Sequence, residues 1–318
     1  MRNAFADELT KLGQEDPRVV MLSGDIGNKL FDKFKAAQPE RFFNCGVAEQ
    51  NMMGVAAGMA MSGLRPVAYT ITPFVTTRCL EQIRTDAAYH EAPVTVVAVG
   101  AGLAYAGLGP THHACEDLSF LRSIPNMVVL APGDEWEVRA GLRAILQQDR
   151  PAYMRMGKKG EPVVHAGAIA DFEIGKAIPM TERPIGDGGE VCLLSTGNLL
   201  PEVLEAGRLL GERGISAQTL SFHTVKPLDE ACLAMAFQRF QRVVSVEEHS
   251  VVGGFGSAVA EWAVDAGIDA RKLLRIGTPD RFFKLSGEQS FARERLGLTA
   301  PQIAERVAGT LKQRTTAA

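Results

Sequence analysis

The segment RFFNCGVAEQNMMGVAAGMA, residues 41–60, carries one acidic side chain, Glu49, ahead of a run of Gly, Ala, Val and Met. So many small and apolar residues predict a helix that packs closely against other parts of the protein. Glu is rarely buried unless it is paired. Glu49 therefore lies either at an exposed helix start, where the helix dipole stabilises a carboxylate, or inside the protein for a chemical purpose.

Short apolar segments alternate with longer amphipathic ones on both sides of this stretch. The expected strands are 18–25, 66–70, 94–99, 126–131, 152–156, 191–196, 215–222, 242–249 and 272–277. Helices are expected over 3–13, 48–62, 74–90 and 134–148, and from about residues 198 and 253. Near-continuous apolar strands separated by helices predict parallel sheets with both faces covered. The predicted fold class is α/β, with two three-layer α/β domains.

The alternation is interrupted over residues 158–190, which are rich in Gly, Pro and charged residues. A chain of 318 residues is long enough for two domains. We therefore expect one domain over 1–157, a linker over 158–190 and a second domain over 191–318.

Composition argues against several classes of function. The chain is 46% hydrophobic and 22% charged with a net charge of −3, which gives no reason to expect nucleic acid or a membrane as a partner. Its five cysteines are scattered and never spaced as CxxC, so neither a disulfide framework nor a metal site is expected. The charged first residues are unlike a signal peptide, and no apolar run is long enough to span a bilayer. The expected location is cytoplasmic.

Two glycine-rich stretches resemble phosphate-binding loops only in part. Gly253-Gly254-Phe255-Gly256 opens an expected helix after a strand, as an anion site would, but its spacing is not GxGxxG. We expect it to serve close helix packing. The GDG within residues 185–190 directly precedes a strand and is expected to form a turn.

Three segments, taken in order, resemble the pyrimidine-binding domain of transketolase and of 1-deoxyxylulose-5-phosphate synthase, which are thiamine diphosphate enzymes. They are residues 41–60, TITPFVTTRCLEQIR at 70–84, and LGPTHHACEDLSFLRSIPNMVVLAPGD at 108–134. FHTVKPLD at 222–229 and EEHSVVGGFGSAVAE at 247–261 are similar to the transketolase C-terminal domain. The resemblance covers nearly the whole chain.

The resemblance implies roles for four residues. In the family, the Glu that matches Glu49 hydrogen-bonds N1′ of the cofactor's aminopyrimidine ring and promotes its imino tautomer, whose 4′-nitrogen removes the thiazolium C2 proton. Such a carboxyl group works best when partly desolvated, because burial disfavours its anion. Phe74 matches the aromatic that stacks on the aminopyrimidine, and Asp25 matches an Asp near the cofactor. His112 matches the His of the Gly-Pro-Thr-His loop beside the reacting centre.

Each of these residues also has a simpler structural interpretation. An aromatic at a helix start, such as Phe74, usually belongs to the core. Asp25 in Ser-Gly-Asp is a common turn or helix-cap residue. His112 alone would more often be structural, and its neighbour His113 either assists substrate binding or faces solvent.

Three cations are candidates for binding a substrate anion. Arg2 matches a family Arg in the first helix, Lys158 stands where the family has an Arg after the last strand of the domain, and Lys29 lies in the loop after Asp25. Lys is a point charge where Arg offers a bidentate fork, and a solvated surface charge is an equal alternative for each.

Two positions depart from sugar transketolases. Counting back from His112, Gly100 and Leu108 stand where those enzymes have a His and an Asp that bind substrate hydroxyls. Removing such polar groups relaxes or changes substrate selection. A ketol donor or acceptor other than the standard sugar phosphates is therefore equally plausible.

The resemblance does not include the diphosphate-binding domain, where the family binds Mg²⁺ and the cofactor's diphosphate. We therefore expect this chain to be the C-terminal, β-type subunit of a split transketolase. It would hold the pyrimidine end of thiamine diphosphate, while a transketolase N-terminal subunit holds the diphosphate and Mg²⁺, in an α2β2 assembly. The expected reaction transfers a two-carbon ketol unit from a ketose-type donor to an aldehyde acceptor.

Three alternatives remain open from the sequence. The β subunit of a 2-oxo acid dehydrogenase shares both domains and a Glu in the same role. A split deoxyxylulose-phosphate synthase would use pyruvate and glyceraldehyde phosphate. A regulatory or scaffold partner of a transketolase N-terminal chain would keep the fold without catalysis.

Overall fold

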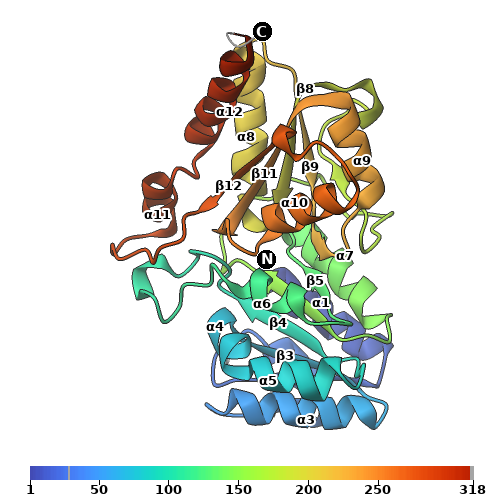
Figure 1. Cartoon of the computed structure of the whole chain (residues 1–318). Coiled ribbons are helices and arrows are strands. Elements are labelled where there is room, and N and C mark those ends of the chain that lie inside the picture. The colour runs from blue at the N-terminus through green and yellow to red at the C-terminus, as the bar shows by residue number, and fades with distance from the viewer. Residues whose placement is uncertain (28, 316–318) are drawn as a thin grey trace.

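The N-terminal sheet has six parallel strands and one antiparallel edge strand (Figure 1). A computed structural model of the chain describes residues 1–27 and 29–315. In spatial order the strands are β10 (Thr224–Lys226), β5 (Val128–Leu130), β6 (Ala152–Met156), β4 (Thr95–Val99), β3 (Arg65–Ile71), β1 (Val19–Ser23) and β2 (Phe42–Asn44). The short helices α2 (Asp32–Ala37) and η1 (Pro39–Arg41) lie between β1 and β2.

Helices cover both faces of this sheet because successive side chains of a strand point to opposite sides. Val20 and Leu22 of β1 share a core cluster with residues of α3 (Glu49–Met61). Val19 and Met21 face the other way and belong to a cluster with α1 (Arg2–Glu15) and α7 (Glu135–Leu146). The helix α6 (Asp117–Ser123) lies between β4 and β5 in the chain and joins the first cluster. The domain therefore has three layers.

The C-terminal domain repeats this arrangement with five strands. Their order is β12 (Leu273–Thr278), β11 (Phe240–Ser250), β8 (Gly189–Thr196), β9 (Ala217–Ser221) and β7 (Ile178–Pro179), and β7 is antiparallel to its neighbour. Its helices are α8 (Leu200–Glu212), α9 (Glu230–Arg239), α10 (Phe255–Asp265), α11 (Gln289–Leu296) and α12 (Ala300–Thr315). Residues of α8 and α12 form one core cluster with the sheet, and residues of α9 and α10 belong to another. The predicted fold class of two three-layer α/β domains is confirmed.

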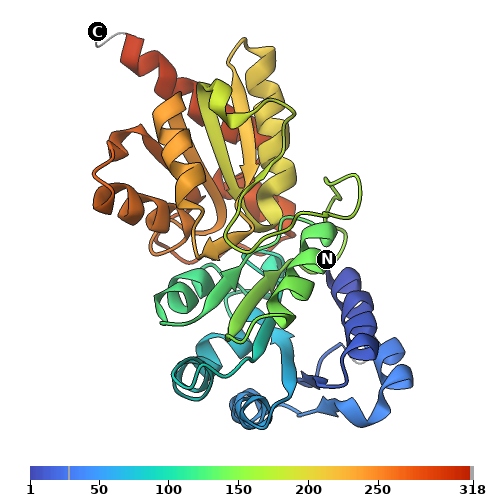
Figure 2. The ribbon, with the colours of Figure 1, turned by 90° about the vertical axis from the view of Figure 1, so that its right-hand side faces the viewer.

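The two domains are joined by more than the linker (Figure 2). Strand β10, which follows β9 of the second sheet, pairs antiparallel with β5 and so extends the first sheet. The segment 158–190, expected to be only a linker, contributes β7 to the second sheet.

Residues 74–90 were expected to form one helix, but the structure divides them into short pieces. These are α4 (Thr72–Val75), η2 (Thr77–Cys79), α5 (Leu80–Gln82) and a π-helical turn, η3 (Ile83–Ala88). The hydroxyls of Thr76 and Thr77 donate to backbone carbonyls four residues earlier. Such bonds compete with the helical ladder and bend helices, which explains the break.

The glycines at 253–256 allow a buried carboxylate to approach the start of α10. Glu247 accepts hydrogen bonds from the backbone N–H groups of Phe255 (2.6 Å) and Gly256 (2.8 Å). A Cβ added at Gly254 would lie 2.2 Å from the Glu247 carboxylate. The chain's own Glu247 thus occupies this helix N-terminus, in keeping with the expected packing role of the glycines.

No helix within residues 1–27 and 29–315 is long and apolar enough to cross a membrane.

His223, between β9 and β10, predicts a loss of stability in mild acid. Its ring is buried, stacks on Phe172 at 4.1 Å and has an Nε2 without a hydrogen-bond partner. Burial lowers the pKa of His223 to about 4, so the folded pKa lies below the unfolded value. The stability that the fold has with a neutral His223 ring is therefore fully present above about pH 6.5 and is lost as the pH falls towards 4. The difference in unfolding free energy between wild type and His223→Gln should therefore change by about 3 kcal/mol between pH 7 and pH 4 in urea titrations.

The matched control is His90→Gln, since His90 is exposed. Its unfolding free energy should follow the wild-type pH dependence. Equal pH slopes for wild type and His223→Gln would contradict the assignment of this proton uptake to His223.

Candidate active site

The candidate residues follow the carboxyl ends of neighbouring parallel strands. Asp25 comes after β1, Glu49 after β2, Phe74 after β3 and Lys158 after β6, while His112 lies in the long loop after β4. Carboxyl ends of parallel strands meet at one edge of a sheet, where open α/β sheets bind ligands. The topology thus places these residues along one edge.

Glu49 is the first residue of α3 and is only 4% exposed. The turn before it contains a left-handed residue, Gly46 at φ +69°, a conformation that glycine adopts without strain. Glu49 Oε2 accepts a hydrogen bond from Nη1 of Arg78 at 2.8 Å. Of the two possibilities for Glu49, the structure shows the internal, paired carboxylate.

Phe74 and His112 lie beside this ion pair. The Arg78 guanidinium lies over the Phe74 ring, 4.4 Å from its centroid. The Phe74 and His112 rings meet edge to face at 5.3 Å. Arg78 therefore connects the carboxylate of Glu49 to the aromatic pair, and the structure brings three of the predicted site residues together.

Asp25 lies at the exposed side of the segment that leads to Glu49. Its Oδ1 accepts a hydrogen bond from Nδ2 of Asn44 at 3.2 Å, and its backbone N–H donates to the Gly46 carbonyl at 3.1 Å. Because Asp25 is exposed, its carboxylate is available to a ligand or a second protein on this edge.

The surroundings of His112 favour the neutral form of its imidazole ring. Burial lowers the pKa of His112, and neighbouring His113 lowers it further. Its Nδ1 lies 3.0 Å from Oγ1 of Thr111, and its ring centroid lies 6.1 Å from that of Tyr105. A neutral imidazole near an exposed edge is suited to hydrogen-bond a polar substrate group.

Tyr105 links His112 to two of the predicted substrate-binding cations. Nζ of Lys158 lies 5.9 Å from the Tyr105 ring centroid. Burial raises the pKa of Tyr105, and the positive charge of Arg2 acts against that rise. Arg2, Lys158 and His112 therefore surround one phenol ring.

The Tyr105 ring also explains one departure from sugar transketolases. A Cβ added at Gly100 would lie 2.2 Å from this ring, and Gly100 has a left-handed φ of +91°. A histidine at this position would collide with the ring of Tyr105. Tyr105 thus fills the space above Gly100.

Three positions lie apart from this cluster. His113 is buried, with Nε2 3.1 Å from the Ala106 carbonyl, and its ring faces Phe283 rather than the Phe74 pair. Leu108 is 57% exposed and lines an apolar groove with residues of the segment 282–286. Lys29 is exposed, and its backbone carbonyl accepts from Asp32.

A cysteine beside Glu49 stays protonated. Cys79 is buried, and burial, together with the negative charge of Glu49, raises the pKa of its thiol to about 12. The thiol donates to the Phe74 carbonyl at 3.3 Å. Among the described residues, no group of three or more His, Cys, Asp or Glu side chains is arranged to hold a metal ion.

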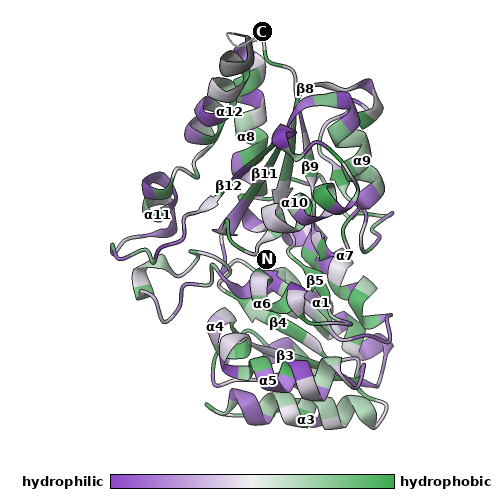
Figure 3. Cartoon of the chain, viewed as in Figure 1, coloured by the Kyte–Doolittle hydropathy of each residue, from purple (hydrophilic) through white to green (hydrophobic). Residues whose placement is uncertain are grey.

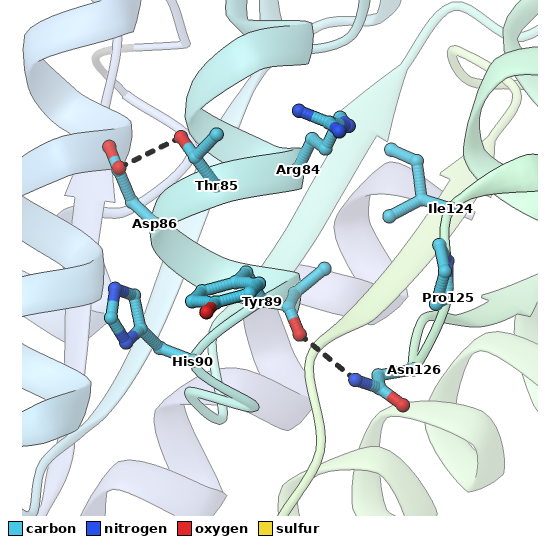
Figure 4. A pocket seen from close by; sticks show the side chains of 9 residues that line it. Arg84, Thr85, Asp86, Tyr89, His90, Ile124, Pro125 and Asn126 are labelled. Atoms are coloured by element: carbon cyan, nitrogen blue, oxygen red, sulfur yellow. Dashed lines mark hydrogen bonds between the residues drawn. The ribbon is translucent and has the colours of Figure 1, made fainter.

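A cavity of about 670 Å³ lies at the opposite edge of the sheet (Figure 4). Figure 4 shows Tyr89 and His90 on one side of it and Asn126 on the other, where Nδ2 of Asn126 donates to the Ala88 carbonyl at 3.2 Å. These residues precede β4 and β5, so the cavity lies at the amino ends of the strands. It is remote from Glu49.

Two residues of the cluster, Arg78 and Tyr105, were not among the predicted site residues. Arg78 stands four residues after Phe74, a spacing that places side chains on the same helix face, and this is the signal that could have found it. Tyr105 precedes the Gly-Pro-Thr-His loop by four residues. Its role depends on the path of that loop, which no local pattern specifies.

Two α/β domains, with a buried carboxylate and an aromatic pair at the carboxyl edge of the first, form the arrangement expected from the transketolase resemblance. Residues 1–161 match the transketolase pyrimidine-binding domain, and residues 183–303 match the transketolase C-terminal domain. The chain belongs to the transketolase family.

The chain is similar to proteins that include the following three. A putative transketolase C-terminal section from Methanocaldococcus jannaschii is 38% identical over 98% of this chain and 96% of its own length. The 6-deoxy-6-sulfo-D-fructose transketolase subunit SqwH from a Clostridium species is 36% identical over 95% of this chain and 92% of its own length. A solved structure, described as a split gene transketolase in an inactive beta4 tetramer, is 36% identical over 98% of this chain and 97% of that one, with a TM-score of 0.86.

Proposed function

We propose that this chain is the β subunit of a two-subunit, thiamine diphosphate-dependent transketolase that transfers a two-carbon ketol unit from a ketose-type donor to an aldehyde acceptor. The observation that carries the proposal is a cluster at the carboxyl edge of a transketolase pyrimidine-binding domain, in which the buried Glu49 lies near the half-buried Phe74 and His112. The similar proteins are named as a C-terminal section, a transketolase subunit and a split gene transketolase, and the chain covers more than nine-tenths of each. These names favour transketolase over the 2-oxo acid dehydrogenase alternative.

The donor set fits the aminopyrimidine end of the cofactor. A buried carboxyl group and an aromatic ring that both contact Arg78 offer one hydrogen-bonding group and one stacking surface, which together suit a flat polar heterocycle. When bound, thiamine diphosphate supplies a carbon nucleophile for carrying the ketol unit. Glu49 would hold a proton at the ring nitrogen N1′, and Phe74 would fix the plane of the ring. His112, at the outer side of Phe74, would hydrogen-bond the substrate.

The substrate's outer end would meet Arg2, Lys158 and Tyr105. Lys158 has a loose ion pair with Glu288, at 3.6 Å, and Nε of Arg2 is buried without a hydrogen-bond partner. The positive charges of Lys158 and Arg2 favour a substrate that carries an anionic group at this end. Lys29, Asp25 and His113 remain predictions for substrate or cofactor contact, and of these His113 has the least support because its ring faces Phe283.

The partner subunit would cover α3 and bring the diphosphate and Mg²⁺ sites. The outer side of α3 exposes Val55 (39%) and Met61 (57%), and Val47 just before it is 78% exposed. Figure 3 shows α3 as mostly pale to apolar in colour along its length. These exposed apolar side chains favour α3 as part of a protein–protein interface. An α2β2 assembly around α3 is the proposed arrangement.

Calorimetry with thiamine diphosphate and Mg²⁺ tests the proposal. We expect no tight binding by this chain alone, because it supplies only the pyrimidine end, and tight binding once a transketolase N-terminal subunit is added. The readout is the dissociation constant with and without that subunit. Tight binding by this chain alone would contradict the two-subunit proposal.

Assays on the same assembly separate the alternative reactions. Transfer of a ketol unit from a ketose to an aldehyde is the expected result. Decarboxylation of a 2-oxo acid with an artificial electron acceptor would instead indicate a 2-oxo acid dehydrogenase. Condensation of pyruvate with glyceraldehyde phosphate would indicate a deoxyxylulose-phosphate synthase.

A further inference from the structure

Arg78 makes contact with both groups that would hold the aminopyrimidine ring. Its Nη1 donates to Oε2 of Glu49 at 2.8 Å, and its guanidinium lies over the ring of Phe74 at 4.4 Å. A planar guanidinium pairs with a carboxylate and stacks on an aromatic face in the same way that a flat heterocycle would. In the free chain, one side chain therefore makes both types of contact expected of the cofactor ring.

Local structure holds Arg78 in this place. It lies in η2, which follows the short helix α4 that contains Phe74, and its guanidinium reaches back over the Phe74 ring. Glu49 begins the neighbouring helix α3, and its side chain is 5% exposed whereas that of Arg78 is 43% exposed. The arginine thus approaches from the solvent side and closes over the carboxylate.

This arrangement has two consequences for a ligand. A carboxylate committed to a guanidinium has one oxygen fewer to offer to a ring nitrogen, and the Phe74 face under Arg78 is not free for stacking. The outer half of Arg78 is solvated, so the side chain can leave without exposing a core. Leaving costs the ion pair and the cation–π contact, which at a partly exposed site together correspond to roughly a tenfold change in affinity.

We propose that Arg78 occupies the pyrimidine site of the free subunit and must move aside when the cofactor ring binds. This inference rests on the proposed function, because it takes Glu49 and Phe74 as the ring's binding groups. A site whose binding-competent state is only partly populated shows a correspondingly weaker apparent affinity. Arg78 would thereby lower the affinity of the unassembled chain for the cofactor.

The test uses the pyrimidine end of thiamine as a probe, so that no diphosphate site is needed. Binding of 4-amino-5-hydroxymethyl-2-methylpyrimidine to the full chain is measured by calorimetry and ligand-observed NMR. Arg78→Met should bind the probe roughly tenfold more tightly than wild type, because the carboxylate and ring face are released. Arg78→Lys, which keeps the charge but loses the planar stacking, should lie between the two and replaces the Met variant if that one does not fold.

Arg84→Met is the matched control. Arg84 is exposed, lies six residues further along the same segment and lines the cavity at the opposite sheet edge. Its probe affinity should equal that of wild type.

Three outcomes would overturn the inference. If Arg78→Met binds the probe more weakly than wild type, Arg78 is a direct ligand of the ring and not its competitor. Equal affinities would mean that Arg78 does not occupy the site, and no binding by any variant would mean that opening the site does not create one. Failure of the proposed function is distinguished by the assembled complex, since cofactor binding there is measured with Arg78 intact.

Discussion

Glu49→Gln should lower the turnover of the assembled enzyme by about 10²- to 10⁴-fold, the range that a positioned general acid or base contributes. The amide is nearly the same size as the carboxyl group, so it preserves packing at a side chain that is 5% exposed. It cannot exchange a proton with a ring nitrogen as a carboxyl group does. The measurement is kcat for ketol transfer by the complex of this chain with its N-terminal subunit.

Glu81→Gln is the control, because Glu81 is an exposed carboxylate in α5 and lies only a few residues after Arg78 in the sequence. It should leave turnover unchanged. The non-enzymatic alternative makes a different prediction for Glu49→Gln, since a regulatory or scaffold chain would keep both its partner affinity and its effect. A variant that keeps wild-type turnover would remove Glu49 from the catalytic assignment.

The positions of the core strands along the chain could be predicted from the sequence because each core strand is a short run of apolar residues. Val19–Ser23 and Thr95–Val99 lie within the expected ranges. The edge strand Phe42–Asn44 was not expected, since it has only three residues and is largely exposed. Strand Thr224–Lys226 joins the first sheet through a partner nearly a hundred residues away, and no local pattern specifies such a pairing.

The candidate site shows the same division between local and long-range information. Glu49, Phe74 and His112 were predicted because their segments resemble transketolase motifs, and the structure brings the three side chains together. Their common environment depends on Arg78, whose long side chain crosses from one helical segment to another. Side chains of this length reach partners that the backbone path alone does not indicate.

His112 and His113 are adjacent in the sequence but have different surroundings. His112 meets the Phe74 ring, whereas His113 bonds the Ala106 carbonyl and faces Phe283 of the C-terminal domain. The backbone N–H groups of both histidines donate to the Gly109 carbonyl, so the two residues lie in a turn and their side chains point in different directions. The resemblance assigned His112 to the reacting centre but left open whether His113 assists substrate binding or faces solvent.

A buried ion pair beneath the His112 loop should dominate the stability of this region. Arg155 of β6 and Asp117 at the start of α6 are 2% and 1% exposed, with Nε and Oδ2 2.9 Å apart. The hydroxyl of Tyr153 also donates to Oδ2 of Asp117. Nη2 of Arg155 donates to the carbonyls of Ala114, just after the loop, and of Glu248 in the C-terminal domain. The pair therefore lies where the loop, the first sheet and the second domain meet.

Asp117→Asn should destabilise the chain by about 3–5 kcal/mol, because it leaves the Arg155 charge buried without a counter-ion. The measurement is the free energy of unfolding in urea. The double variant Asp117→Asn/Arg155→Met should recover part of this loss, since removing both charges also removes the unpaired one, whereas two independent effects would add. Asp187→Asn is the control, because Asp187 lies at an exposed ion pair with Arg183 and should cost about 1 kcal/mol or less. If Asp117→Asn costs no more than this control, the buried pair does not hold the loop, and the placement of His112 must depend on its aromatic contacts with Phe74 and Tyr105.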